Sequence, residues 1–282
     1  MKLVNSVFEI AESFMKNSKY VSINEKEIEY VANDMLLIGK PTFFLPKIED
    51  IPKSILLELI AASVNYCYFY GRSDIRPNGC NSSKMYENLM NAFYNYTFNE
   101  NINDYINVFK NLLMFDRFPL LEERFKHLDE LKEMATKFVK IVENNHSNIE
   151  PLLNYLVTEF PGFGSDIFLK RASLFFMQLY RRFGWFEQEL HNFHVPADYQ
   201  IPKMLEHYNC IKYSPDLKNF IETYQLIPKN SLQECEIRSA TILTCKRLCT
   251  LTKWNVADVD TYFFTKRNTC FNPFHMTITT DY

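Results

Sequence analysis

The scarcity of glycine constrains the fold of this chain more than any other feature of its sequence. Only 6 of the 282 residues are glycine. Dinucleotide-binding and sheet-rich folds need glycine in tight turns and phosphate-binding loops, because it adopts backbone conformations that other residues avoid. Helices need few glycines. The sequence therefore predicts an all-α fold with minor extended segments, and it argues against a Rossmann-type or predominantly β architecture.

Apolar residues recur three and four positions apart along most of the chain, as they do in amphipathic helices. A chain of this length lies near the upper limit for one hydrophobic core. We therefore expect a single domain over residues 1–282, with residues 1–50 forming a helical subregion packed on it. The predicted helices span residues 7–16, 25–37, 54–66, 84–96, 102–113, 120–143, 149–160, 167–180, 217–226, 231–254 and 258–267, and a further helix opens near Pro202.

Composition and charge restrict the cellular location and the binding partners that we expect for this chain. The net charge of -3 lacks the basic excess of a typical duplex-binding surface. No apolar run reaches the ~20 residues of a membrane span, and the N-terminus does not read as a signal peptide. Seven irregularly spaced cysteines predict reduced thiols in a cytoplasmic protein, or in the host cytoplasm if the source is viral. We expect no membrane association and no cofactor. We also expect no metal site, because no cysteine or histidine pair has a complementary pair at zinc spacing.

Lys170 does not fit its apolar neighbours. On a helix it shares one face with Ile167 and Leu174, and the opposite face is also apolar. A buried ammonium needs a carboxylate or an anionic ligand as partner. The alternative is a lysine at the helix start whose long side chain reaches water, beside Arg171. The residues alone favour neither interpretation.

Two further charged positions stand next to apolar segments. Asp198 precedes the proline-opened helix, where it is either a capping residue or a carboxylate beside a pocket. Glu236 lies near the start of the long helix at 231–254, where the helix dipole alone would favour it. Arg238 follows in the same helix, and a guanidinium beside an apolar run usually has a designated anionic partner. The 42 phenylalanines and tyrosines suggest a thick core or a pocket that stacks a flat ligand.

Several short segments, taken together and in order, resemble the queuosine-salvage family. The matching segments are residues 119–124, 156–161, 168–172, 197–202, 211–214, 233–238 and 273–275. The resemblance implies an all-helical fold akin to the helix-hairpin-helix DNA glycosylases. It also implies hydrolysis of queuosine 5′-phosphate, a small modified nucleotide, to free queuine.

The resemblance assigns roles to individual residues. Lys170 matches the family's active-site lysine and Asp198 its catalytic aspartate. A fixed carboxylate can stabilise the cationic sugar that develops as a base–sugar bond breaks, and an ammonium can hold a phosphate or a leaving group. We expect further substrate contacts from the neighbouring segments, namely Phe69, Tyr70, Arg72, Asp74, Arg76, Arg171, Tyr199, Glu236, Arg238 and His275.

The loop at residues 71–83 departs from the family pattern. Where the family has a Phe-Trp-Ser-Asp run, this chain reads Tyr-Phe-Tyr-Gly-Arg from Tyr68 to Arg72. Phage enzymes of thymine hypermodification displace pyrophosphate or phosphate from activated 5-hydroxymethyluracil in DNA. Arg72 and Arg76 would suit the binding of that leaving group. That activity is the alternative hypothesis, and a non-catalytic nucleotide-binding or scaffold protein is a third. The oligomeric state stays open.

Overall fold

Helices make up most of the chain in the computed structural model, which describes residues 2–43, 45, 48–71, 79–97 and 100–282. The helices are α1 (Lys2–Met15), α2 (Glu25–Ile38), α3 (Ile51–Ser63), α4 (Ser82–Phe93), α5 (Ile102–Phe115), α6 (Leu121–Asn144), α7 (Ile149–Glu159), α8 (Pro161–Gly164), α9 (Lys170–Phe183), α10 (Gln200–His207), α11 (Pro215–Glu222), α12 (Leu232–Thr252) and α13 (Val256–Lys266), with 3₁₀ turns η2 (Glu189–Asn192) and η3 (Arg267–Thr269). Strands β1 (Val21–Ile23) and β2 (Ile211–Tyr213) pair antiparallel. The mostly helical fold class is confirmed.

Side-chain caps explain where several helices begin. Asn148 accepts a hydrogen bond from the amide of Glu150, and Ser231 accepts one from the amide of Glu234, so each satisfies an amide that the first helical turn leaves free. The prediction of a helix from residue 167 was wrong by three residues. Leu169 takes a left-handed conformation, with φ of 49°, and α9 begins at Lys170. Residues 161–164, between the helices predicted at 149–160 and 167–180, form the single-turn helix α8.

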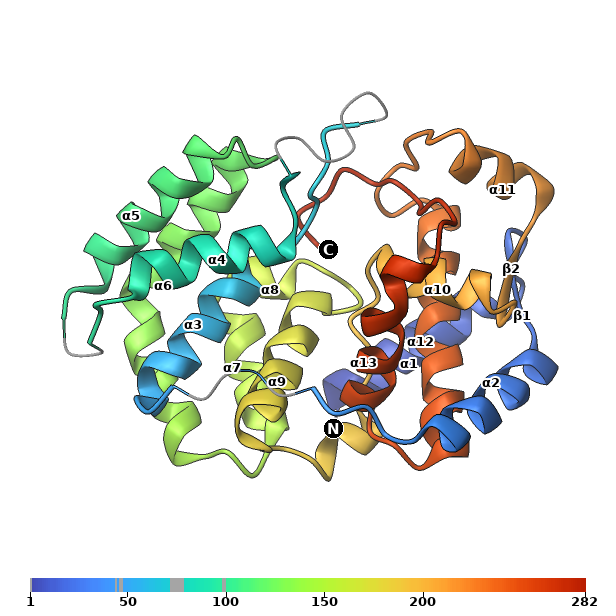
Figure 1. Ribbon diagram of the computed structural model, residues 1–282, viewed down its shortest axis with the longest axis horizontal. Helices are drawn as coiled ribbons and strands as arrows, with labels where there is room; N and C mark the ends of the chain where they lie inside the picture. Colours follow the sequence, from blue (N-terminus) through green and yellow to red (C-terminus); the bar gives the residue numbers. More distant parts are fainter. Residues whose placement is uncertain (1, 44, 46–47, 72–78, 98–99) are drawn as a thin grey trace.

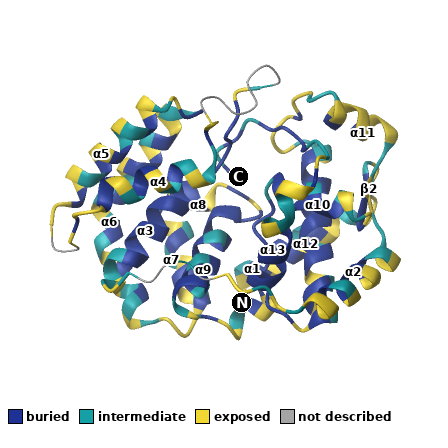
Figure 2. Ribbon diagram, viewed as in Figure 1, coloured by how far each residue is buried: buried dark blue, intermediate teal, exposed yellow. Residues whose placement is uncertain are grey.

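Two groups of helices lie side by side, with the C-terminus between them (Figure 1). One group contains α3 to α9, with α3 packed against α6 and α9, and the other contains α1, α2 and α10 to α13 with the two strands. Helix α12 is buried on nearly all sides (Figure 2), which is why its sequence shows little amphipathic pattern. The N-terminal helices α1 and α2 pack on α12.

A continuous hydrophobic core runs from Val4 in α1 to Tyr282 at the C-terminus. The tail returns through the middle of the molecule, where the amide of Cys67 donates to the carbonyl of Tyr282 at 2.9 Å. All seven cysteines are buried and free of disulfides. Within the described residues, none of the helices combines the length and the apolar character that crossing a membrane would require.

Candidate active site

A cavity of about 550 Å³ opens between the two groups of helices. Its volume lies within the range of small-molecule sites. Its wall comes from the extended segment after α3, the start of α4, the helices α9 and α13, and the segment that leads into α10. The polar and charged lining residues include Asn65, Tyr66, Tyr68, Ser82, Ser83, Tyr86, Lys170, Gln178, Arg181, Asp198, Tyr199, Gln200, Asp260, Thr261, Arg267, Asn268 and Tyr282.

Lys170 is the first residue of α9 and lines this cavity with only 2% of its surface exposed. Its ammonium donates a hydrogen bond to the carbonyl of Asn65 at 2.7 Å. Within the described residues it forms no ion pair, although Asp198 is close enough to interact with it electrostatically. Burial lowers the pKa of Lys170 to about 8, and Asp198 opposes that shift. The side chain therefore does not reach bulk water, and it presents a cation inside the cavity.

Asp198 caps α10 and lines the same cavity. Its Oδ1 accepts hydrogen bonds from the amides of Gln200 at 2.7 Å and Ile201 at 3.4 Å. Its Oδ2 accepts none from the part of the chain that the structure describes. The two roles that the sequence left open are thus compatible, because one oxygen fixes the carboxylate while the other stays available to a ligand.

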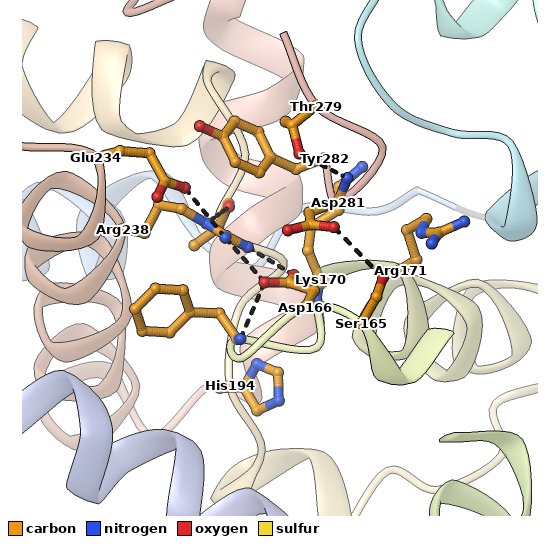
Figure 3. Close-up of polar contacts among 12 residues, drawn as sticks. Ser165, Asp166, Lys170, Arg171, His194, Glu234, Arg238, Thr279, Asp281 and Tyr282 are labelled. Carbon is orange, nitrogen blue, oxygen red and sulfur yellow. Dashed lines mark hydrogen bonds and ion pairs between the residues drawn. The ribbon is translucent and has the colours of Figure 1, made fainter. Parts of the chain in front are cut away.

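Arg238 connects the backbone segments that carry Lys170 and Asp198, and Figure 3 shows its contact with Asp166 beside Lys170. It forms a bidentate ion pair with Asp166, with distances of 2.9 and 2.7 Å, and its Nε donates to the carbonyl of Ala197 at 3.0 Å. Asp166 in turn accepts a hydrogen bond from the amide of Lys170 at 2.8 Å. Arg238 therefore has the anionic partner that its sequence context predicted, but that partner is a buried protein carboxylate.

A second buried ion pair lines the cavity on the side of α13. The guanidinium of Arg181 lies 2.6 Å from Oδ2 of Asp260 and also donates to Thr261 at 3.0 Å. Burial raises the pKa of Asp260 despite this partner, and Asp198 adds to the rise. The cavity thus holds two carboxylates and at least two buried cations, a combination suited to a ligand with hydroxyl groups and negative charge.

The aromatic wall differs from the expected one. Tyr66, Tyr68, Tyr199 and Tyr282 line the cavity. Phe69 packs instead against Tyr199 and Phe274, with ring centroids 5.5 and 5.7 Å away. Tyr70 is 49% exposed, and its hydroxyl donates to the carbonyls of residues 117 and 118 outside the cavity. Of the predicted aromatic contacts, the structure brings only Tyr199 to the cavity directly.

Three other predicted substrate contacts do not line the cavity and form hydrogen bonds to protein groups. Arg171 points away from Asp166 in Figure 3 and donates to the carbonyls of Ser63 and Gly162. Glu236 accepts hydrogen bonds from the amides of residues 19–21, and His275 lies within hydrogen-bonding distance of the Tyr282 hydroxyl at 3.3 Å. Their role in substrate binding stays a prediction. Arg72, Asp74 and Arg76 lie outside the described residues.

Comparison with known proteins matches residues 82–270 to the family model of the queuosine salvage protein. That match spans more than half of the chain. The chain belongs to the queuosine salvage protein family. Its match to the queuosine 5′-phosphate N-glycosylase/hydrolase of Sphaerobacter thermophilus is 30% identical over 142 residues, 44% of this chain and 44% of that protein. The proteins of the same name from Dictyostelium discoideum and Mus musculus match at 30% and 25% identity, over 47% and 44% of this chain and 44% and 42% of their own lengths.

The queuosine salvage match includes Lys170, Asp198 and Arg238, whereas Tyr68, Phe69 and His275 lie outside it. The aligned segments span less than half the length of these curated relatives. Among the described residues, no group of three or more histidine, cysteine or acidic side chains could hold a metal ion.

Sequence reasoning missed three notable parts of the site. Asp166 was not singled out, although an Asp directly before an apolar helical segment, here the one predicted from Ile167, is a recognisable start signal. The pair of Arg181 and Asp260 joins residues 79 positions apart, so no local spacing marks it. Tyr68 was named only as part of an aromatic run, without a role.

Proposed function

We propose that this chain hydrolyses the N-glycosidic bond of a modified nucleotide related to queuosine 5′-phosphate and releases the free base. The observation that carries the proposal is the presence of Lys170 and Asp198 on the wall of one cavity, each fixed by backbone hydrogen bonds. Family membership supports it, since the curated relatives are named as glycosylases or hydrolases of that nucleotide. A fold akin to the helix-hairpin-helix DNA glycosylases is part of the proposal.

Asp198 supplies the charge that such a reaction needs. As the bond between the sugar and the base breaks, its electron pair stays on the base and positive charge develops on the sugar. A carboxylate fixed beside the anomeric carbon stabilises that charge and can accept the proton of the attacking water. Oδ1 is held by two amides, so Oδ2 is the oxygen we assign to this work.

Lys170 supplies a fixed positive charge on the same wall. With a pKa of about 8 it is mostly protonated at neutral pH. Its partner in the protein is a neutral carbonyl, so its charge is not cancelled by an ion pair within the described chain. We assign it to binding negative charge on the substrate, either the phosphate or the departing base.

Incubation of the purified protein with queuosine 5′-phosphate tests the proposal. We expect equimolar queuine and ribose 5-phosphate by liquid chromatography and mass spectrometry, and loss of both products with Asp198→Asn. Guanosine 5′-phosphate is the matched control, because it carries the same sugar phosphate with an unmodified base. Intact queuosine 5′-phosphate after prolonged incubation with folded wild-type protein would contradict the proposal.

A further inference from the structure

Tyr68 carries a hydroxyl that has no hydrogen-bond partner among the described residues. The side chain is 4% exposed and lines the cavity, and its oxygen has no hydrogen bond within the described structure. Most buried polar groups in proteins are paired, so a lone buried donor beside a candidate active site needs a physical explanation.

The ring of Tyr68 is held firmly in place. It packs edge-on against Phe118 at 6.1 Å, and the guanidinium of Arg124 lies 5.3 Å from its centroid. Arg124 also donates to the carbonyls of Val64, Tyr66 and Cys67, which fixes the backbone leading to Tyr68. These contacts fix the position of the ring, and with it that of the hydroxyl.

The groups near the hydroxyl point to an acceptor. Asp198 and Tyr199 both interact electrostatically with Tyr68, and burial raises the pKa of this phenol well above its usual value. Tyr68 therefore stays protonated and can act as a donor. Asp198 has one oxygen, Oδ2, that accepts no hydrogen bond in the described chain. A lone donor and a lone acceptor thus face the same cavity.

We propose that Tyr68 is a positioning residue, whose hydroxyl donates a hydrogen bond to Oδ2 of Asp198 when substrate fills the cavity. The inference rests on the proposed function. Hydrogen bonds within catalytic groups are often long or misaligned in the free protein and tighten when substrate binds. With Oδ1 held by the first two amides of α10 and Oδ2 by Tyr68, the carboxylate plane would be fixed toward the sugar.

Tyr68→Phe tests this inference, because it removes only the unpaired oxygen. We expect kcat on queuosine 5′-phosphate to fall about ten- to a hundredfold, the range for a hydrogen bond to a charged group, with KM within a few-fold. The Tm of the ligand-free protein should not fall, because no hydrogen bond is lost there. Tyr155→Phe is the control, since Tyr155 also has a buried unpaired hydroxyl but stacks on Phe138 away from the cavity. It should leave both kcat and Tm unchanged.

The possible outcomes separate the two proposals. Normal wild-type hydrolysis with an unchanged kcat for Tyr68→Phe would overturn the role of Tyr68 and leave the proposed function intact. A lower kcat accompanied by a clearly lower Tm would also overturn it, because the residue would then act through stability. Absence of wild-type hydrolysis would overturn the proposed function and this inference together.

Discussion

The buried ammonium of Lys170 makes the rate of the proposed reaction depend on pH. Its pKa falls from 10.5 to about 8, mainly because the side chain is buried; Asp198 and Asp166 oppose the shift, and the nearby cations Arg171 and Arg238 contribute to it. The net depression corresponds to roughly 3 kcal/mol of unfavourable free energy for the charged form. If substrate binding requires the cation, kcat/KM should fall tenfold for each pH unit above about 8.

The assay compares kcat/KM of wild type and Lys170→Arg from pH 6 to 10. This quantity reports ionisations of the free enzyme, to which the pKa of about 8 applies. Arginine stays protonated throughout this range, so the decrease above pH 8 should vanish in the variant, even though a guanidinium fits the site less well and the rate is lower at every pH. The two profiles should therefore differ in shape as well as in height.

Stability provides an independent check on the same group. Between pH 8 and 10.5 the unfolded state holds the proton of Lys170 more often than the folded state does. The free energy of unfolding should therefore rise with pH in this window, by up to about 3 kcal/mol, relative to Lys170→Met. A wild-type rate profile that is flat to pH 9.5, or a decrease above pH 8 that persists in Lys170→Arg, would refute the reasoning.

Three further predictions concern other parts of the molecule. Asp198→Asn keeps an oxygen to cap α10 but loses the charge, so turnover should fall by a factor that corresponds to ~3 kcal/mol or more. Calorimetry should show a ligand affinity within a few-fold of wild type, and near-normal turnover would exclude a catalytic Asp198. Arg238→Met leaves Asp166 buried without its cation, and urea unfolding should show a loss of about 3–5 kcal/mol, whereas an unchanged midpoint would show that the pair contributes little. Oligonucleotide binding should be undetectable at low salt; steeply salt-dependent binding that Arg72→Ala and Arg76→Ala both weaken would favour a DNA substrate instead.

The sequence predicts the helical fold well because most helices carry a clear apolar face. It predicts helix ends less well where a distant side chain decides them. Asp166 accepts hydrogen bonds from the amides of Phe168 and Lys170 at 3.0 and 2.8 Å and so fixes the start of α9. Arg238 from α12 in turn holds Asp166 in place. The helical spacing of apolar residues continues through residues 167–169, so it gives no sign that Asp166 and Arg238 make the helix begin at Lys170.

The candidate site was predicted in its charges more than in its aromatic wall. Lys170 stood out because an ammonium conflicts with its apolar neighbours, whereas Asp198 also fitted a capping role and took its catalytic assignment from the family resemblance. The aromatic run after α3 offered no comparable signal, because every residue in it is apolar enough for the core. Cys67 takes a left-handed conformation, with φ of 31°, and turns the chain so that Tyr68 faces the cavity while Phe69 joins the core.

The network around Arg238 shows how a residue that does not line the cavity can still affect the candidate site. Lys170 begins one helix and Asp198 precedes another, and the two residues belong to different segments of the chain. Arg238 binds the carboxylate of Asp166, which accepts a hydrogen bond from the amide of Lys170. It also donates to the carbonyl of Ala197, directly before Asp198. Because its guanidinium is rigid and planar, it sets both distances at once. The spacing between the two proposed catalytic groups is therefore controlled from α12, a buried helix behind the cavity.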